Sequence, residues 1–177
     1  ETYKIALDSY LCEKEIPPQI KINPETGTKT YFDEVDFVKV ETEGDKILHS
    51  IAIAREGRER VILKDGEEVF SDPNSVRISV IRVSEDFSKI LIMDDAAYNP
   101  WTEAVMIDGD ENVSIAKGRD MMFHGEASRR DLSETVFSYI TNESGKKQKG
   151  KTEIMVWDQE ARCGKINISL DKSFASL

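Results

Sequence analysis

Short apolar segments rich in valine and isoleucine alternate with polar turns along the whole chain. Glycine, proline, asparagine and aspartate cluster between these segments at intervals of roughly ten residues, which is typical of strands joined by turns. Apolar residues keep a helical spacing only over residues 120–124 and 128–134, each long enough for about one turn. The pattern therefore predicts an all-β fold.

Four segments of seven residues each end in an aspartate. They are residues 2–8, 59–65, 102–108 and 152–158. A second strand is expected ahead of the last three, at residues 46–54, 89–95 and 135–142. Lys46 precedes Lys89 by 43 positions, and Asp65 precedes Asp108 by the same interval. This coincidence predicts that both strands of the unit keep one register from one unit to the next.

An Asp-x-Ser triplet lies ahead of the second strand and also recurs. Asp86-Phe87-Ser88 and Asp131-Leu132-Ser133 are 45 positions apart, and residues 171–173 repeat the triplet near the end of the chain. Further strands are expected before the triplets and after the aspartates, at residues 35–40, 76–83, 67–71, 112–116 and 165–170. The unit is therefore about 44 residues and four strands long, which is the size of a β-propeller blade.

The expected architecture is a β-propeller or part of one, with about four antiparallel blades of four strands and roughly 44 residues each. One such sheet cannot cover both of its apolar faces alone, whereas stacked sheets cover each other. A sandwich of two sheets is an alternative all-β arrangement. The recurring 43-residue interval argues against the sandwich.

Two stretches resemble known propeller repeats. Residues 154–158 (IMVWD) resemble the strand ending of a WD-repeat blade, and residues 86–91 (DFSKIL) resemble the turn and strand of related propeller repeats. The resemblance covers three to four units. The Gly-His pair of WD-repeats is absent, and Leu7, Lys64 and Ile107 stand where the tryptophan of the repeat would be expected. The chain is therefore similar to the broader, degenerate propeller superfamily.

The organisation predicted is one propeller-type domain over residues 1–177, or a fragment of a larger propeller. Residues 11–30 fit the blade pattern badly and predict an irregular excursion, since Pro17 and Pro18 cannot donate ladder hydrogen bonds. The chain begins on an aspartate-ending strand and stops where a second strand should start. In a closed ring of four blades the first and last segments of the chain would be neighbours in one blade. In a fragment of a larger propeller they would be unpaired sheet edges, and we favour the fragment.

Composition limits the classes of partner. The chain has 177 residues, 34 acidic and 24 basic, and a formal net charge of −10, which disfavours nucleic-acid binding. No apolar window approaches the roughly 18 residues of a membrane span. Cys12 and Cys163 could form a disulfide only if the fold brings them together, and small buried side chains are the simpler interpretation. The compartment is not indicated.

No catalytic, cofactor-binding or metal-binding residue is predicted. The G-x-S-x-G, P-loop and G-x-G-x-x-G motifs are absent from the sequence. Residues 108–112 place oxygens like the start of a calcium loop, but Val113 and Arg119 stand where that loop needs Gly and Glu. His49 lies inside an apolar strand, where a metal ligand is uncommon, and His124 has no second ligand at zinc spacing. The four strand-ending aspartates, at positions 8, 65, 108 and 158, are expected to support turns.

Loops that join the second and third strands are the expected binding surface, because in propellers such connections share one face. Here they are residues 55–58, 94–101 and 143–151. The candidate partner-binding residues are Tyr98, Asn99, Trp101, Lys146, Lys147 and Lys149. The aromatic pair resembles an anchor for a protein partner, and the lysines could attract an acidic one. The plainer alternatives are that Trp101 packs between blades and that the lysine tract is merely solvated.

Two functions are compatible with these features. The first is a non-catalytic scaffold that binds a protein or peptide, or the remainder of a longer chain, through its loops. The alternative is the substrate-gating propeller of a prolyl-oligopeptidase-like serine hydrolase, whose catalytic domain would lie outside this chain. The alternative rests on fold-level analogy.

Overall fold

The computed structural model describes residues 19–22, 29–32, 34–44, 46–57, 59–96, 101–141 and 151–170. Every helix or strand within these ranges is a β-strand, and the sheets are antiparallel, so the predicted all-β class is confirmed. β1(Gln19–Ile22) and β2(Lys29–Phe32) pair with each other in a two-stranded sheet. These strands occupy part of the range 11–30 that was expected to be an irregular excursion, and the remainder of that range lies outside the described residues.

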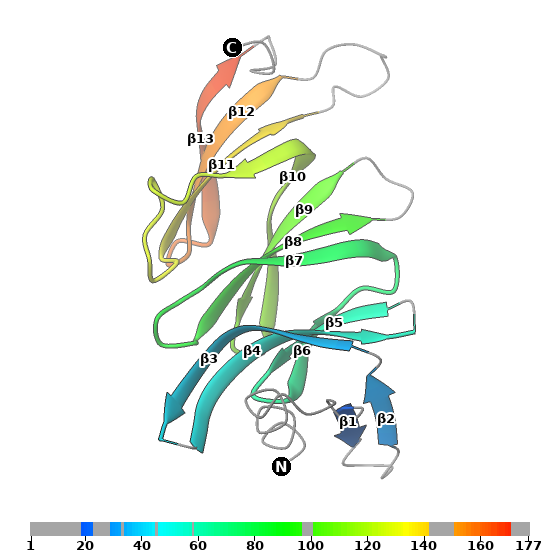
Figure 1. Cartoon of the computed structure of the whole chain (residues 1–177). Coiled ribbons are helices and arrows are strands. Elements are labelled where there is room, and N and C mark those ends of the chain that lie inside the picture. The colour runs from blue at the N-terminus through cyan, green and yellow to red at the C-terminus, as the bar shows by residue number, and fades with distance from the viewer. Residues whose placement is uncertain are drawn as a thin grey trace. The chain divides into compact units, whose positions relative to one another are not determined.

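The chain divides into two compact units, one up to Ile78 and one from Ser79 onward. The first contains a four-stranded sheet whose strands follow one another in chain order (Figure 1). They are β3(Glu34–Glu43), β4(Lys46–Glu56), β5(Glu59–Lys64) and β6(Glu67–Ser71). One face of this sheet carries a cluster of small and aliphatic side chains, namely Ala52, Ala54, Val61 and Leu63, against which Val35 and Phe37 pack.

A seven-stranded antiparallel sheet makes up the second unit, again in chain order. Its strands are β7(Ser75–Val83), β8(Lys89–Ala96), β9(Thr102–Asp108), β10(Glu111–Phe123), β11(Glu134–Ile140), β12(Thr152–Asp158) and β13(Cys163–Leu170). The boundary between the units falls within β7. Residues 120–123 belong to β10, so the helical turn allowed at 120–124 is wrong.

β10 exchanges one neighbour for the other along its length. Residues 111–118 pair with β9, whereas Arg119, Met122 and Phe123 pair with β11. The register is irregular between Arg119 and Met122, and Asp120 there has a φ of 49°, in the left-handed region that asparagine and aspartate tolerate best after glycine. The strand therefore divides the sheet into two halves, β7 to β9 with the first part of β10, and the second part of β10 with β11 to β13.

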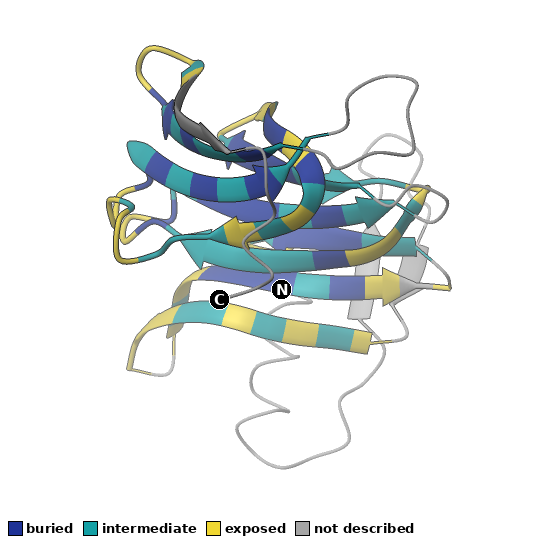
Figure 2. Ribbon diagram, turned by 90° about the horizontal axis from the view of Figure 1, so that it is seen from above, coloured by how far each residue is buried: buried dark blue, intermediate teal, exposed yellow. Residues whose placement is uncertain are grey.

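The two halves pack against each other through one hydrophobic cluster. Leu91, Ala104 and Met106 from β8 and β9 join Ile115 and Ala116 of β10, and the other half contributes Leu132, Phe137, Tyr139, Met155 and Trp157. Full burial of one such large side chain is worth about 1.5–3 kcal/mol. The opposite face of β8 and β9 is buried as well, because Ile90, Ile92, Val105 and Ile107 are at most 6 % exposed. The burial colours of Figure 2 show this concentration of buried residues along the strands and of exposed ones in the turns.

The predicted common register is wrong, although β4 and β8 do begin at Lys46 and Lys89. Lys64 pairs with Glu67, and Asp108 pairs with Glu111, and each pair closes a two-residue turn. Asp108 is therefore equivalent to Lys64 and not to Asp65. Likewise Lys64 lies opposite Ile51, whereas Asp108 lies opposite Lys89. Lys89 therefore corresponds to Ile51. β4 starts earlier because its first residues extend beyond β5 and pair with β3.

Gly118 of β10 lies directly against Tyr139 of β11. A Cβ atom at this position would lie 2.6 Å from Cδ2 and 2.8 Å from Cβ of Tyr139. These contacts are with a core ring and its stem on β11, so the clash cannot be relieved by moving a flexible side-chain end. Glycine at position 118 is thus a packing requirement for the change of partner along β10.

We expect Gly118→Ala to lower the free energy of unfolding by about 1–3 kcal/mol, the usual cost of overpacking a core. Urea unfolding followed by circular dichroism measures the change. Lys117→Ala, an exposed position next in the strand, serves as the control and should change stability much less. Equal stability of Gly118→Ala and the unsubstituted chain would contradict this account of the approach to Tyr139.

Candidate functional site

Trp101 is the one proposed partner-binding residue that falls within the described part of the chain. It is partly buried and lies immediately before β9. The other proposed residues, Tyr98, Asn99, Lys146, Lys147 and Lys149, lie outside the described residues. The structure therefore locates the expected anchor but neither brings the six residues together nor separates them.

Arg119 is a charged neighbour of Trp101. Its guanidinium carbon lies 6.0 Å from the centroid of the indole ring, at the outer limit of a cation–π contact. The contact forms because Thr102, next to Trp101, pairs with Gly118, next to Arg119. Arg119 also lies opposite Ile140, the last residue of β11. The pair thus lies where β9 begins and β11 ends.

The guanidinium of Arg119 is poorly satisfied. Its Nε atom is buried and has no hydrogen-bond partner. Across the described ranges, no carboxylate forms an ion pair with Arg119. Lys117, two residues earlier on the same strand, does have such a partner, since its Nζ lies 3.1 Å from Glu103 Oε2. Sequence analysis did not identify the contact of Arg119 with Trp101, because nothing in the local sequence distinguishes this residue from other arginines.

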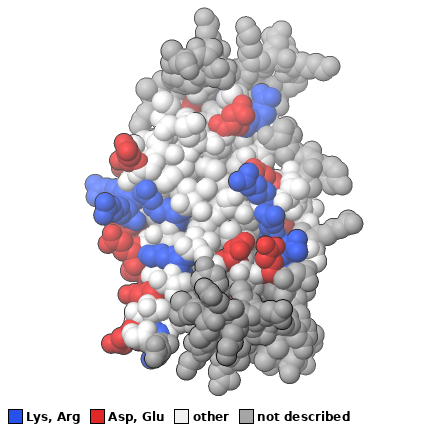
Figure 3. Space-filling model, in the orientation of Figure 1, with Lys and Arg blue, Asp and Glu red and all other residues white. Residues whose placement is uncertain are grey.

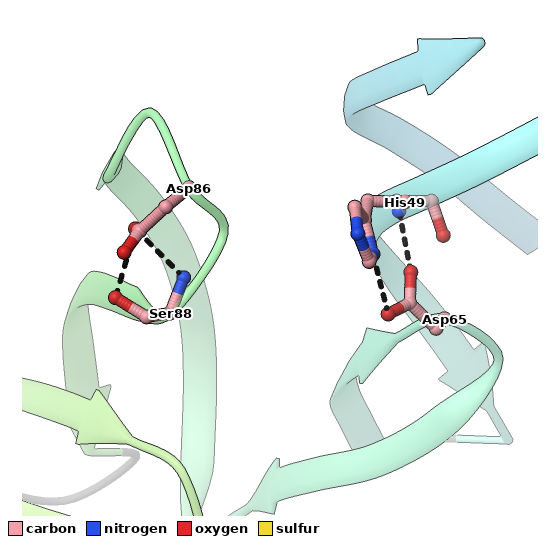
Figure 4. A network of polar contacts seen from close by, with 5 residues as sticks. His49, Asp65, Asp86 and Ser88 are labelled. Carbon is pink, nitrogen blue, oxygen red and sulfur yellow. Dashed lines mark hydrogen bonds and ion pairs between the residues drawn. The ribbon is translucent and has the colours of Figure 1, made fainter. Parts of the chain in front are cut away.

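Of the strand-ending aspartates that the structure describes, Asp158 supports its own turn as expected, whereas Asp65 binds the neighbouring strand and Asp108 binds Gln159. Asp65 accepts a hydrogen bond of 2.6 Å from the Ser50 backbone N–H through Oδ1, and its Oδ2 lies 3.2 Å from His49 Nδ1 (Figure 4). Asp158 accepts the Ala161 backbone N–H at 2.9 Å. Asp8 lies outside the described residues.

Metal binding has no support among the side chains that the structure describes. No group of three or more histidine, cysteine, aspartate and glutamate residues there could hold an ion. The segment that begins like a calcium loop forms a two-residue turn, in which Gly109 has a φ of 60° and Asp108 pairs with Glu111.

Gln159 connects the two halves of the seven-stranded sheet. It is only 6 % exposed. Its Oε1 accepts the indole N–H of Trp157 at 2.9 Å, and its Nε2 donates to Asp108 Oδ2 at 3.0 Å. The three side chains satisfy each other in a mainly apolar environment, where an unpaired donor is costly. Sequence analysis did not identify Gln159, and a lone glutamine after a strand carries no signal that would.

The two Asp-x-Ser turns have the same geometry. Asp86 Oδ1 accepts the Ser88 N–H at 3.0 Å and the Ser88 hydroxyl at 2.8 Å (Figure 4), and Asp131 Oδ1 accepts the corresponding groups of Ser133 at 3.0 and 2.7 Å. The middle residues, Phe87 and Leu132, have φ angles of 58° and 59° and are buried. Each turn thereby inserts one apolar side chain into the core ahead of a second strand.

These turns also stabilise the ionised aspartates. The hydroxyl of Ser84 and both donors of Ser88 hold the pKa of Asp86 far below its ordinary value of 3.8. The hydroxyl and the backbone N–H of Ser133 likewise lower the pKa of Asp131. Both carboxylates are therefore structural acceptors that remain charged at neutral pH.

His124 has a partner that sequence analysis did not identify. Its Nε2 lies 2.9 Å from the hydroxyl oxygen of Ser138 on β11, and its backbone N–H donates to the Val136 carbonyl. The contact extends the pairing between β10 and β11 beyond the end of β10. His124 therefore has a structural role at this strand end.

On the face shown in Figure 3, acidic and basic groups lie close to one another, and much of the described surface between them is uncharged. Exposed ion pairs contribute to this mixture, including Arg55 with Glu34 and Arg162 with Glu111. Such exposed pairs are each worth only a few tenths to about 1 kcal/mol. Charge alone therefore does not mark a binding surface on this face.

A scan of protein-family models finds no match to this chain, and searches of curated proteins and of solved structures find no similar protein. Within the described ranges, no helix is both long and apolar enough to cross a membrane.

We expect Asp86→Asn to reduce the loss of stability in acid. Because the folded-state pKa of Asp86 lies below 3.8, the ionised form stabilises the fold fully at neutral pH. This stabilisation declines as the pH falls below the unfolded-state pKa and disappears below the folded one. Asparagine keeps the acceptor oxygen without the charge.

Urea midpoints measured from pH 7 down to pH 2.5 test this expectation. The midpoint of Asp86→Asn should fall less steeply with acid than that of the unsubstituted chain. Glu85→Gln, at the exposed neighbouring residue, controls for the loss of one negative charge. Parallel curves for Asp86→Asn and the unsubstituted chain would count against the assigned role of the turn.

Gln159→Ala should lower the free energy of unfolding by about 1–3 kcal/mol, because it leaves the buried indole N–H of Trp157 without an acceptor. Chemical denaturation gives the value, and Glu160→Ala, at the exposed next residue, is the control. If Trp157→Phe is as stable in the Gln159→Ala background as Trp157→Phe alone, the cost arises from the lost indole hydrogen bond. A full additional loss in the double variant would refute that origin.

Proposed function

We propose that the chain is part of a β-propeller and serves as a non-catalytic module that binds a protein or peptide. The observation that carries the proposed function is the contact of partly buried Trp101 with Arg119, between the start of β9 and the end of β11. Both strands adjoin a connection between a second and a third strand, which is where a propeller presents its binding loops.

The packing of unlike faces supports a stack of sheets. Lys89 lies opposite Asp108, and Glu134 lies opposite Asp158. If Lys89 and Glu134 occupy equivalent places in the two halves, then Leu91 of the first half is equivalent to Val136 of the second. In the same way Ile92 is equivalent to Phe137. Leu91 nevertheless packs in the same cluster as Phe137. The face of the first half that carries Leu91 therefore meets the face of the second half that is equivalent to the one carrying Ile92. Contacts between unlike faces can be continued by further units.

Burial of β8 and β9 on both faces favours this arrangement over a sandwich. In a sandwich of two sheets each sheet buries one face and leaves the other to solvent. Here Leu91 and Met106 are buried on one face, and Ile90 and Ile107 on the other. The four-stranded sheet β3 to β6 has the same strand order and would be a further blade of the same kind.

The chemistry at Trp101 and Arg119 is that of recognition. Tryptophan and arginine are enriched among the interface residues that dominate binding energy, because each provides a large contact area together with directed polar groups. Trp101 remains partly exposed, unlike Trp157, which is only 7 % exposed. An aromatic ring that served only the core would be expected to be buried like Trp157.

We expect Trp101→Ala to weaken peptide binding at least tenfold, which corresponds to about 1.4 kcal/mol. Peptides are selected from a displayed library of linear sequences on the immobilised chain and their affinities are measured by fluorescence anisotropy. Met122→Ala removes an exposed apolar side chain from β10 and is the matched control. Circular dichroism confirms that both variants are folded. Selected peptides that bind Trp101→Ala as tightly as the unsubstituted chain, or a library without binders, would contradict the proposal.

A further inference from the structure

Arg119 differs from the other arginines whose contacts are described. Arg55, Arg130 and Arg162 each lie within 4.0 Å of a carboxylate oxygen. Arg82 donates to the Gly125 carbonyl at 3.2 Å and stacks on Phe123. Arg119 has only the ring of Trp101 on one side and a buried Nε without an acceptor.

The buried Nε of Arg119 cannot reach a ligand, but the terminal nitrogens of this guanidinium are not among the buried unpartnered atoms and can meet an external acceptor. Removing an N–H group from water without giving it a partner costs free energy, and a charged group costs more. The chain has an excess of ten negative charges, yet within the described ranges none of its carboxylates is placed against this guanidinium. The terminal nitrogens of Arg119 and the adjacent indole face therefore present a cation and an apolar surface together.

We propose that Arg119 binds a carboxylate of the partner peptide while an apolar residue of that peptide packs on Trp101. This inference rests on the proposed function and specifies the chemistry of its partner. The planar guanidinium fork matches the two oxygens of a carboxylate and binds them through two parallel hydrogen bonds. Lys117 cannot replace it, because its ammonium group already faces Glu103.

Two sources can supply such a carboxylate, an acidic side chain or the C-terminus of a peptide. Three short synthetic peptides of the same apolar residues separate them. The first carries two glutamates and blocked ends, the second carries glutamines in their place with blocked ends, and the third is the glutamine peptide with a free C-terminal carboxylate.

The indole N–H signals of Trp101 and Trp157 provide the readout, in a chain labelled with ¹⁵N-tryptophan and assigned with Trp101→Phe. Titration with a carboxylate peptide should shift the Trp101 signal in a saturable way. The Trp157 signal should stay in place, because that N–H is bonded to Gln159 inside the core. The glutamine peptide with blocked ends should bind at least tenfold more weakly.

Arg119→Met, which keeps the aliphatic stem without the charge, should weaken binding of the carboxylate peptide at least tenfold, and Arg119→Lys should restore it only in part. Lys117→Met is the matched control, since it removes one positive charge from the same strand, and it should change affinity less than threefold. Urea unfolding of each variant shows that the fold is retained. If Arg119→Met does not fold, Arg119→Lys alone decides through its affinity for the carboxylate.

Several outcomes would overturn the inference. These are equal binding of the glutamate and glutamine peptides, equal loss in Lys117→Met and Arg119→Met, and no shift of the Trp101 signal with any carboxylate peptide. If library selection still yields peptides that depend on Trp101 but not on Arg119, the proposed function stands and the carboxylate assignment fails. If no selected peptide depends on Trp101, the proposed function fails.

Discussion

The central physical constraint on this chain is that β8 and β9 are apolar on both faces. An antiparallel sheet can leave one face to water, and many do, with polar residues alternating along each strand. Here Ile90, Leu91 and Ile92 follow one another without a polar residue, as do Ala104 to Ile107, and all are buried. Such strands require a cover on each side, and the half sheet formed by β11 and β12 supplies one of them.

That cover depends on the change of partner along β10. A strand that pairs with β9 over its first part and β11 over its last part can bring the two halves face to face only if it alters direction between them. The left-handed conformation of Asp120 and the missing side chain of Gly118 meet this requirement. Gln159 then closes the contact with directed hydrogen bonds, joining Trp157 to Asp108 across the packed faces. Packing provides most of the stabilisation, and the polar link fixes one alignment.

Strand positions could be predicted from the sequence, because alternating apolar residues and turn residues act locally. Pairing register could not, since the equal spacing of Lys46 and Lys89 reflects where strands begin and not which residues face each other. The Asp-x-Ser turns were identified because their hydrogen bonds span only two residues. Gln159 was missed because it bonds to Asp108, which lies 51 positions away in the sequence. The contact of Arg119 was missed because it depends on the indole ring of Trp101 beside the neighbouring strand.

Trp101 illustrates how the proposed recognition would follow from the same constraint. Its aromatic side chain and its place beside a loop could be read from the sequence. Its contact with Arg119 exists only because Thr102 pairs with Gly118, the residue that permits the change of partner along β10. The geometry that lets two apolar faces meet therefore also brings an arginine beside a partly exposed tryptophan. Because no described carboxylate pairs with that arginine and its terminal nitrogens are not among the buried unpartnered atoms, the proposed carboxylate would bind those nitrogens from outside. The proposed site would thus be a consequence of how the strands are packed, and its proposed preference for a carboxylate a consequence of the guanidinium that no described carboxylate pairs with.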